Sequence, residues 1–253
     1  MMVVRLAVGL VIVLASLCSV RSLAAAEQPA RWKSVCLIKT VIEREGKQNV
    51  RSSSAFFVKR GEQVYLTTAR HSSEESLPTS LVLFSIGDKS FNLKLSELGL
   101  APGNDWLTKP NYDLAVLPVA HKLLSEVACI DLEDCRRDLP PPKTAVEAVG
   151  FPLALGALGP DLSPIVIEGK LASGELTDPF KSDGQRMAVC VPAIAEGTSG
   201  APLFGDEGDE KWRVIGIITG NLADGSGGKL GKFVPAHAMI DLIEVDAAAS
   251  EKK

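Results

Sequence analysis

Short apolar runs recur along most of the chain, and each is bounded by Gly, Pro or polar turn residues. Their length and spacing indicate β-strands, because an amphipathic helix would repeat its apolar positions every three or four residues. The strands are predicted at 35–41, 55–58, 64–68, 81–86, 114–119, 145–149, 165–167, 187–191, 214–219 and 233–234. One helix is predicted near the end, over 236–245, with Met239, Leu242 and Ile243 on one face. The pattern predicts an all-β sandwich or barrel fold.

Three consecutive prolines mark the best candidate for a connector. Pro140, Pro141 and Pro142 stay extended and cannot join a sheet ladder. All-β barrels of this chain length commonly form one domain. We therefore expect one domain over 27–245 with a junction between its halves near 135–145, followed by a flexible tail at 246–253.

The first 26 residues have the layout of a secretory signal peptide. Arg5 precedes an uncharged, mostly apolar run over 6–20, and the alanines at 24–26 offer an A-x-A cleavage site. The run is short for a membrane span. We expect cleavage after Ala26, delivery to the periplasm or the exterior and no membrane attachment afterwards. A retained signal anchor is the alternative.

Charge and histidine usage narrow the classes of function. The formal net charge is −4, and no sizeable Lys/Arg cluster occurs, so we do not expect nucleic-acid binding. The histidines at 71, 121 and 237 are scattered, and the sequence holds no C-x-x-C pair. We therefore expect neither a metal site nor a cofactor. The oligomeric state does not follow from the sequence.

Four cysteines follow the predicted leader, at positions 36, 129, 135 and 190. An even number in an exported chain permits two disulfides. Cys129 and Cys135 are close enough in sequence to close a small loop, which makes them a disulfide candidate. Free buried thiols are the alternative.

The segment 196–203, Glu-Gly-Thr-Ser-Gly-Ala-Pro-Leu, is a candidate nucleophile loop. A serine hydroxyl needs a base that takes its proton and donors that meet the developing oxyanion. Glycines on either side of Ser199 let the backbone turn sharply, so that the amides of Gly197 and Ser199 can point into one oxyanion hole. The alternative is a Gly/Ser/Pro turn between two strands.

Two other strand boundaries carry the residue types that such a serine requires. The strand over 64–68 leads into His71, and Asp113 stands directly before the strand over 114–119. Each signal alone is weak, since a lone histidine is usually a surface or core residue and a lone aspartate usually starts a turn. In the order His, Asp, Ser, the three together favour a catalytic triad in which Asp113 orients the imidazole.

This ordered set resembles the trypsin-like serine peptidases, from about Trp32 to about Val245. The matching motifs are Thr68-Ala69-Arg70-His71, Asp113-Leu114-Ala115-Val116-Leu117 and Gly197-Thr198-Ser199-Gly200-Ala201-Pro202. The resemblance implies two six-stranded antiparallel β-barrels with a C-terminal helix. It also implies an endopeptidase that acts on protein or peptide substrates, with the triad in the cleft between the barrels.

Within that family the chain is most similar to the bacterial HtrA-type (Deg) protease domain without a PDZ module. The similar segments are Ser54-Ala55-Phe56-Phe57-Val58, Val149-Gly150-Phe151-Pro152, Ile167-Glu168-Gly169-Lys170-Leu171 and Gly231-Lys232-Phe233-Val234-Pro235-Ala236. Thr198 stands where digestive enzymes carry the aspartate that pairs with a new N-terminus. Threonine has no charge for that pairing, so activity would be constitutive or controlled by loop order.

The resemblance also implies a position for the primary substrate pocket. Ala193 would form its base, with walls from Thr219, Gly220, Asn221 and Gly231. No acid stands at the base, so a bound Lys or Arg side chain would be left unpaired at a cost of several kcal/mol. We expect small or medium apolar residues before the cleaved bond.

Two rival functions remain open. An α/β-hydrolase would use Ser199, Asp224 and His237 in that order, but the loop lacks the second glycine of G-x-S-x-G and helices are too few. The second is a catalytically inactive peptidase-like domain that binds peptides or protein partners, because a fold does not guarantee activity. Thr198 and Glu196 beside the oxyanion turn, together with Arg70 beside the base, would then leave the site misassembled.

Overall fold

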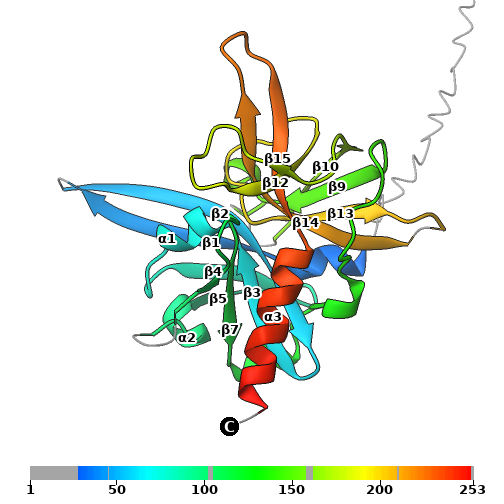
Figure 1. The fold of residues 1–253 in the computed structure, drawn as a ribbon. Helices are drawn as coiled ribbons and strands as arrows, with labels where there is room; N and C mark the ends of the chain where they lie inside the picture. The colour runs from blue at the N-terminus through cyan, green and yellow to red at the C-terminus, as the bar shows by residue number, and fades with distance from the viewer. Residues whose placement is uncertain (1–27, 45, 102–104, 158–161, 210, 252–253) are drawn as a thin grey trace, which may run out of the picture.

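The computed structural model describes residues 28–251 apart from 45, 102–104, 158–161 and 210. Two β-sheets and the C-terminal helix α3 (His237–Ser250) dominate the fold (Figure 1). The predicted leader lies outside the described residues. Within the described part of the chain, no helix is long and apolar enough to cross a membrane.

The first sheet begins with a long hairpin that projects beyond the sheet (Figure 1). In the hairpin, Val35 lies opposite Phe56 and Arg44 lies opposite Lys47. The strand order is β5 (Lys89–Lys94), β4 (Leu81–Ile86), β1 (Val35–Arg44), β2 (Lys47–Arg60), β3 (Gln63–Thr68), β7 (Ala115–Val119) and β6 (Leu107–Thr108). Strand β8 (Ile130–Asp131) pairs in parallel with β2.

The second sheet closes on itself. Its order is β10 (Ile165–Leu171), β9 (Ala145–Gly150), β13 (Pro202–Asp206), β14 (Trp212–Ala223), β15 (Lys229–Pro235), β12 (Arg186–Val191) and β11 (Leu176–Thr177). Because β10 also pairs with β12, six of these strands form a barrel. The chain passes from the first sheet to the second between Asp131 and Ala145.

Short helical turns connect the strands. They are η1 (Ala30–Ser34), α1 (Arg70–Glu74), α2 (Leu95–Leu98), η2 (Lys122–Ser125), η3 (Leu132–Asp134) and η4 (Pro152–Ala154).

The predicted all-β class is confirmed, and each predicted strand overlaps an observed one. Hydrogen bonds between the described strands close the second sheet into a six-stranded barrel, while the described strands of the first sheet form an open path from β5 to β6. The pattern missed β5, since polar residues separate its half-buried Phe91 and Leu93 at the edge of the sheet. It also missed β13, which lies between β9 and β14 in the second sheet and is mostly buried. Helix α3 runs to Ser250, beyond its predicted end at 245.

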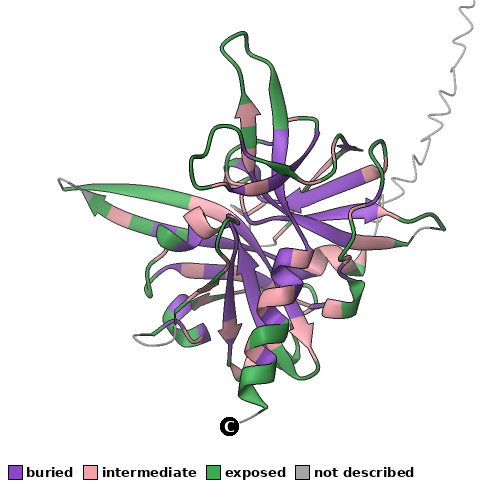
Figure 2. Cartoon of the chain, in the orientation of Figure 1, coloured by how far each residue is buried: buried purple, intermediate pink, exposed green. Residues whose placement is uncertain are grey.

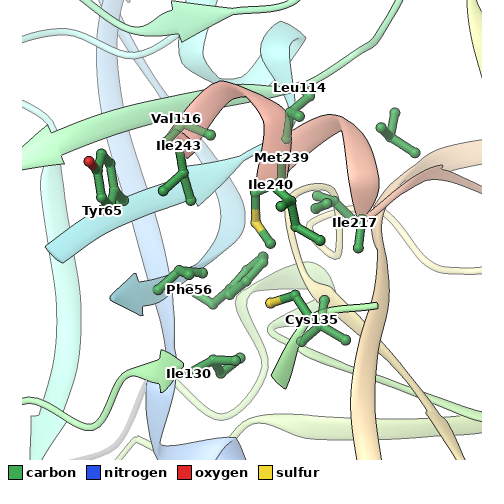
Figure 3. Close-up of a cluster of buried hydrophobic side chains, with 14 of the residues drawn as sticks. Phe56, Tyr65, Leu114, Val116, Ile130, Cys135, Ile217, Met239, Ile240 and Ile243 are labelled. Atoms are coloured by element: carbon green, nitrogen blue, oxygen red, sulfur yellow. The ribbon is translucent and has the colours of Figure 1, made fainter. Parts of the chain in front are cut away.

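Three apolar clusters form the core: one belongs to the first sheet, one to the second, and a central one contains residues of both. Figure 2 shows how burial concentrates in the interior of the molecule. Side chains alternate across β2, so that Phe57 packs inside the first sheet and Phe56 enters a central cluster between the sheets. Met239 and Ile243 of α3 pack into the same central cluster (Figure 3). Removing one fully buried Phe from such a core typically costs about 3–5 kcal/mol. The central cluster therefore fixes one sheet relative to the other.

The four cysteines of the described chain are free thiols, so the predicted Cys129–Cys135 disulfide is not formed. Cys135 packs into the central cluster, whereas Cys129 packs against the cluster inside the first sheet. Burial raises the pKa of the Cys129 thiol to about 11, and it also raises the pKa of Cys135. Both side chains behave as small apolar groups.

Candidate active site

His71 lies in the first turn of the short helix α1, three residues beyond Thr68, the last residue of β3. The Thr68 hydroxyl donates a hydrogen bond to the carbonyl oxygen of Ser54, 2.9 Å away, and so anchors the end of β3. The neighbouring Arg70 guanidinium lies 3.7 Å from the Glu74 carboxylate.

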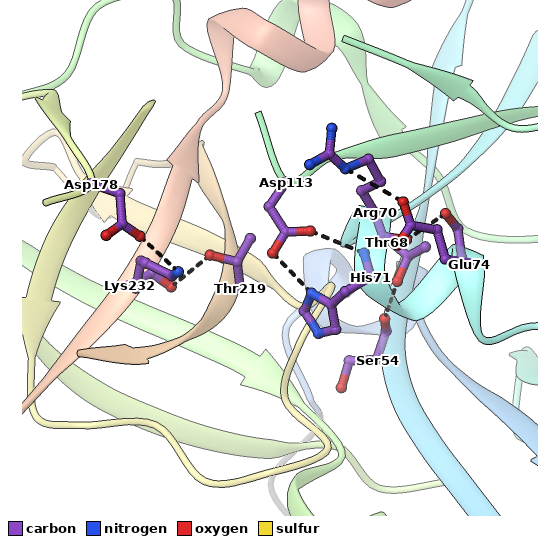
Figure 4. Close-up of polar contacts among 10 residues, drawn as sticks. Ser54, Thr68, Arg70, His71, Glu74, Asp113, Asp178, Thr219 and Lys232 are labelled. Carbon is purple, nitrogen blue, oxygen red and sulfur yellow. Dashed lines mark hydrogen bonds and ion pairs between the residues drawn. The ribbon is translucent and has the colours of Figure 1, made fainter. Parts of the chain in front are cut away.

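Asp113 stands between a turn and the start of β7, and it is 8% exposed. One carboxylate oxygen, Oδ2, lies 2.8 Å from His71 Nδ1, and the other accepts the His71 backbone N–H at 3.0 Å (Figure 4). These two contacts fix both the position and the plane of the imidazole. A carboxylate at Nδ1 selects the tautomer in which Nε2 can accept a proton.

The charge on Asp113 follows from competing effects. Burial raises the pKa of its carboxyl, but hydrogen bonds from the His71 ring and backbone, together with the charges of His71 and Lys232, outweigh it. The pKa therefore lies below its usual value. Asp113 is ionised at neutral pH and can stabilise a protonated His71.

The loop that carries Ser199 depends on two glycines with positive φ. Gly197 has φ 87° and Gly200 has φ 89°, a region that favours glycine. A Cβ atom on Gly200 would lie 2.0 Å from the carbonyl oxygen of Ser54. The Gly200 amide donates to the Ile218 carbonyl at 2.7 Å, which ties the loop to β14.

Ser54 on β2 joins the serine loop to the first sheet. Its hydroxyl donates to the Gly197 carbonyl at 2.8 Å and accepts the Phe151 N–H at 2.9 Å. Its own N–H donates to the Ser199 carbonyl at 2.9 Å. In the sequence, Ser54 stands only as a serine at the start of an apolar strand segment, which does not indicate this role. This residue sets the position of the nucleophile loop from the opposite sheet.

His71 and Ser199 line one cleft of about 660 Å³. The other residues around it are Ile38, Thr40, Val50, Arg51, Ser52, Ser53, Ser72, Glu75, Leu153, Glu196 and Gly197. Among the described residues, no hydrogen bond joins Ser199 Oγ to the imidazole, and the backbone amides of Gly197 and Ser199 have no acceptor. Catalytic hydrogen bonds often tighten only when substrate binds.

None of the residues predicted to form the primary pocket is among the described residues that line this cleft. Asn221 bonds through its side-chain amide to both backbone groups of Ile194, and Gly231 packs closely against Ile194. These two predicted residues therefore lie beside the segment that carries Ala193. The Thr219 hydroxyl instead donates to the Lys232 carbonyl at 3.5 Å and is buried.

The described residues hold no group of three or more His, Cys, Asp or Glu side chains with a metal-binding arrangement. What the site brings together is an oriented imidazole, an ionised carboxylate and a serine on a glycine-bounded loop. That set can activate a hydroxyl as a nucleophile.

Comparison with known proteins shows what this arrangement is similar to. No protein-family model and no curated protein matches the sequence. The MamO protease domain from Magnetospirillum magneticum, in its apo form, is 18% identical with a TM-score of 0.57, covering 83% of this chain and 95% of that one. The HtrA-type protease AlgW with a tripeptide is 19% identical with a TM-score of 0.53. An AlgW variant with a decapeptide is 17% identical with a TM-score of 0.58.

The AlgW structures extend beyond the matched region. The chain covers 59% of the tripeptide-bound AlgW chain and 64% of the decapeptide-bound one, while 84% and 87% of this chain are matched. At these identities the likeness shows the fold. The predicted trypsin-like fold, as found in HtrA-type protease domains, is confirmed.

Replacing Gly200 by Ala should destabilise the protein by about 3 kcal/mol, because the residue has a positive φ and its new Cβ would meet the Ser54 carbonyl. Gly174→Ala is the matched control, since a Cβ at Gly174 meets nothing within 4 Å. Urea unfolding of both variants measures the difference. Equal stability of the two variants would show that the loop is not constrained as described.

Asp113 should make folding stability sensitive to acid. Its pKa is lowered in the folded state, so its contribution is fully present above the unfolded pKa of about 3.9 and is lost as the pH falls through the lower folded value. Asp113→Asn should therefore lose less stability than wild type below about pH 4. Urea midpoints at several pH values measure this, with Asp88→Asn in the exposed β4–β5 turn as control. Parallel pH curves for wild type and Asp113→Asn would contradict the assignment.

Proposed function

We propose that this chain is an exported serine endopeptidase that cleaves peptide bonds through an acyl-enzyme. Ser199 is the nucleophile, His71 the general base and Asp113 the group that orients the imidazole. The observation that carries the proposal is that Asp113 holds His71 through two hydrogen bonds, and that His71 and Ser199 line the same cleft.

Each step follows from the residues at the cleft. Ser199 Oγ attacks the carbonyl carbon while its proton passes to His71 Nε2, and the amides of Gly197 and Ser199 donate to the oxyanion. The C–N bond then breaks, and the imidazolium gives its proton to the leaving amine. Water next attacks the Ser199 ester and gives a proton to His71, which returns it to Ser199 Oγ as the acid product leaves.

Peptides are the proposed substrates and partners because the similar AlgW structures hold a tripeptide and a decapeptide. The predicted signal peptide supports release to the periplasm or the exterior. No cofactor takes part in the proposed chemistry.

Catalytically silent peptide binding is the second candidate. It is favoured by one observation: among the described residues, no hydrogen bond joins Ser199 to His71. A silent domain would bind peptides with equal affinity in wild type and in Ser199→Ala, and neither form would release product.

Removing any triad member should abolish turnover. Ser199→Ala or His71→Ala should lower kcat by about 10⁶-fold, because the triad acts as a unit. Asp113→Asn should lower kcat by about 10⁴-fold through the wrong imidazole tautomer. Hydrolysis of a mixed peptide library, quantified by mass spectrometry, measures these changes. Turnover retained in His71→Ala would refute the assignment.

The residue before the cleaved bond should be small or medium and apolar, because Ala193 offers no charge at the proposed pocket base. Peptides that differ only in Val, Ala or Arg at that position test the preference through kcat/KM. We expect Val and Ala to exceed Arg by at least about tenfold, corresponding to about 1.4 kcal/mol. A clear preference for Arg would overturn this part of the proposal.

A further inference from the structure

A polar network centred on Glu175 lies next to the triad, in a segment that carries none of the sequence motifs. Glu175 Oε1 accepts hydrogen bonds from the Tyr112 hydroxyl at 2.9 Å and from Arg186 Nε at 3.1 Å. Its other oxygen lies 3.2 Å from His237 Nε2. One carboxylate therefore connects the loop before β7, strand β12 and the start of α3.

Tyr112 is the chain neighbour of Asp113, so this network reaches the triad directly. The Tyr112 ring packs edge-on against His237, with centroids 5.7 Å apart and planes at 89°. Lys109 Nζ lies 5.3 Å from the centre of the same ring. The ring is thus held at its hydroxyl by the second sheet and on its surface by two cationic or aromatic neighbours.

The backbone before Asp113 needs such support. Asn111 has φ 63°, a left-handed conformation that is uncommon outside glycine and that asparagine adopts more often than most other residues. The Arg186 backbone N–H donates to the Asn111 carbonyl at 2.6 Å. A conformation of this kind persists when its surroundings over-determine it. Since Asp113 itself precedes β7, these contacts from the second sheet hold the backbone that presents it.

Asp178, three residues after Glu175, forms a second polar contact in this part of the molecule. The Asp178 carboxylate lies 3.1 Å from Lys232 Nζ, and the two residues are 2% and 9% exposed. The Thr219 hydroxyl donates to the Lys232 carbonyl, and both residues are drawn with Asp113 and His71 in Figure 4. Removing one partner of a buried ion pair is costly, so Asp178 holds the Lys232 ammonium in place.

We propose that Glu175 is a positioning residue for the triad, which acts through Tyr112 to fix the loop that presents Asp113 to His71. The proposal rests on the function proposed above. Glu175 contacts Tyr112, Arg186 and His237, and its role is to hold the aspartate at the distance that keeps the imidazole oriented.

Hydrolysis kinetics of single variants give the first test of the proposal. Glu175→Ala should lower kcat by about 10- to 100-fold with KM unchanged, because a small misplacement far from the chemistry has effects of that size. Tyr112→Phe removes only the hydroxyl contact and should show a smaller fall in the same direction. Glu168→Ala, an exposed acid on β10, is the matched control and should leave kcat unchanged.

Combination with Asp113→Asn separates positioning from general destabilisation. If Glu175 acts through Asp113, Glu175→Ala should cause no further fall in kcat in the Asp113→Asn background. An equal fall in both backgrounds would overturn the proposal. Urea unfolding of each variant confirms that folded protein is being compared.

A proton NMR measurement tests the positioning role without relying on turnover. In the Ser199→Ala protein, the His71 Nδ1 proton bonded to Asp113 should appear far downfield, and it should move or vanish in Ser199→Ala/Glu175→Ala. An unchanged resonance would overturn the positioning role even if hydrolysis is never observed. Absence of hydrolysis with a Glu175-dependent resonance would instead reject the proposed peptidase function and leave the positioning role intact.

Discussion

The site depends on the contact between the two sheets, because each sheet supplies different members of the triad. His71 and Asp113 flank strands of the first sheet, while Ser199 stands on the loop before β13 of the second. The central cluster of buried side chains, with Phe56 and Met239 among them, sets the distance between these groups. Hydrogen bonds from Ser54 then fix the serine loop locally.

The electrostatics of the site follow from the same packing. Asp113 is buried, yet hydrogen bonds from the His71 ring and backbone hold the pKa of its carboxyl below the usual value. A negative charge that is fixed in this way favours a protonated imidazole, which is the state that must form during attack by a serine. The structure thus holds an ionised aspartate and an oriented imidazole beside the cleft.

Much of the fold was predictable from the sequence because buried strands leave continuous apolar runs. Edge strands such as β5 were missed, since they bury too few side chains to stand out. The three triad candidates were found because each lies at the boundary of such a run. The helical setting of His71 was missed, since α1 is only five residues long.

The rest of the site depends on contacts between distant segments, which periodicity does not report. Ser54 forms a hydrogen bond with Gly197, which is 143 positions away in the sequence. Glu175 forms one with Tyr112, which is 63 positions away. The spacing of Cys129 and Cys135 permitted a disulfide, but the two thiols pack into different clusters. Likewise, the Thr219 hydroxyl, predicted to line the substrate pocket, donates a hydrogen bond to the Lys232 carbonyl.

The proposed function requires that His71 and Asp113 activate Ser199 as a nucleophile. The most direct measurement is the intact mass of the protein after incubation with a fluorophosphonate, followed by peptide mapping of the adduct. Attack by Ser199 Oγ forms an O–P bond, releases fluoride and transfers the proton to His71. We expect one adduct per chain, located on Ser199 and formed far more slowly in His71→Ala. A folded wild-type protein that acquires no adduct, or acquires it elsewhere, would show that Ser199 is not an activated nucleophile.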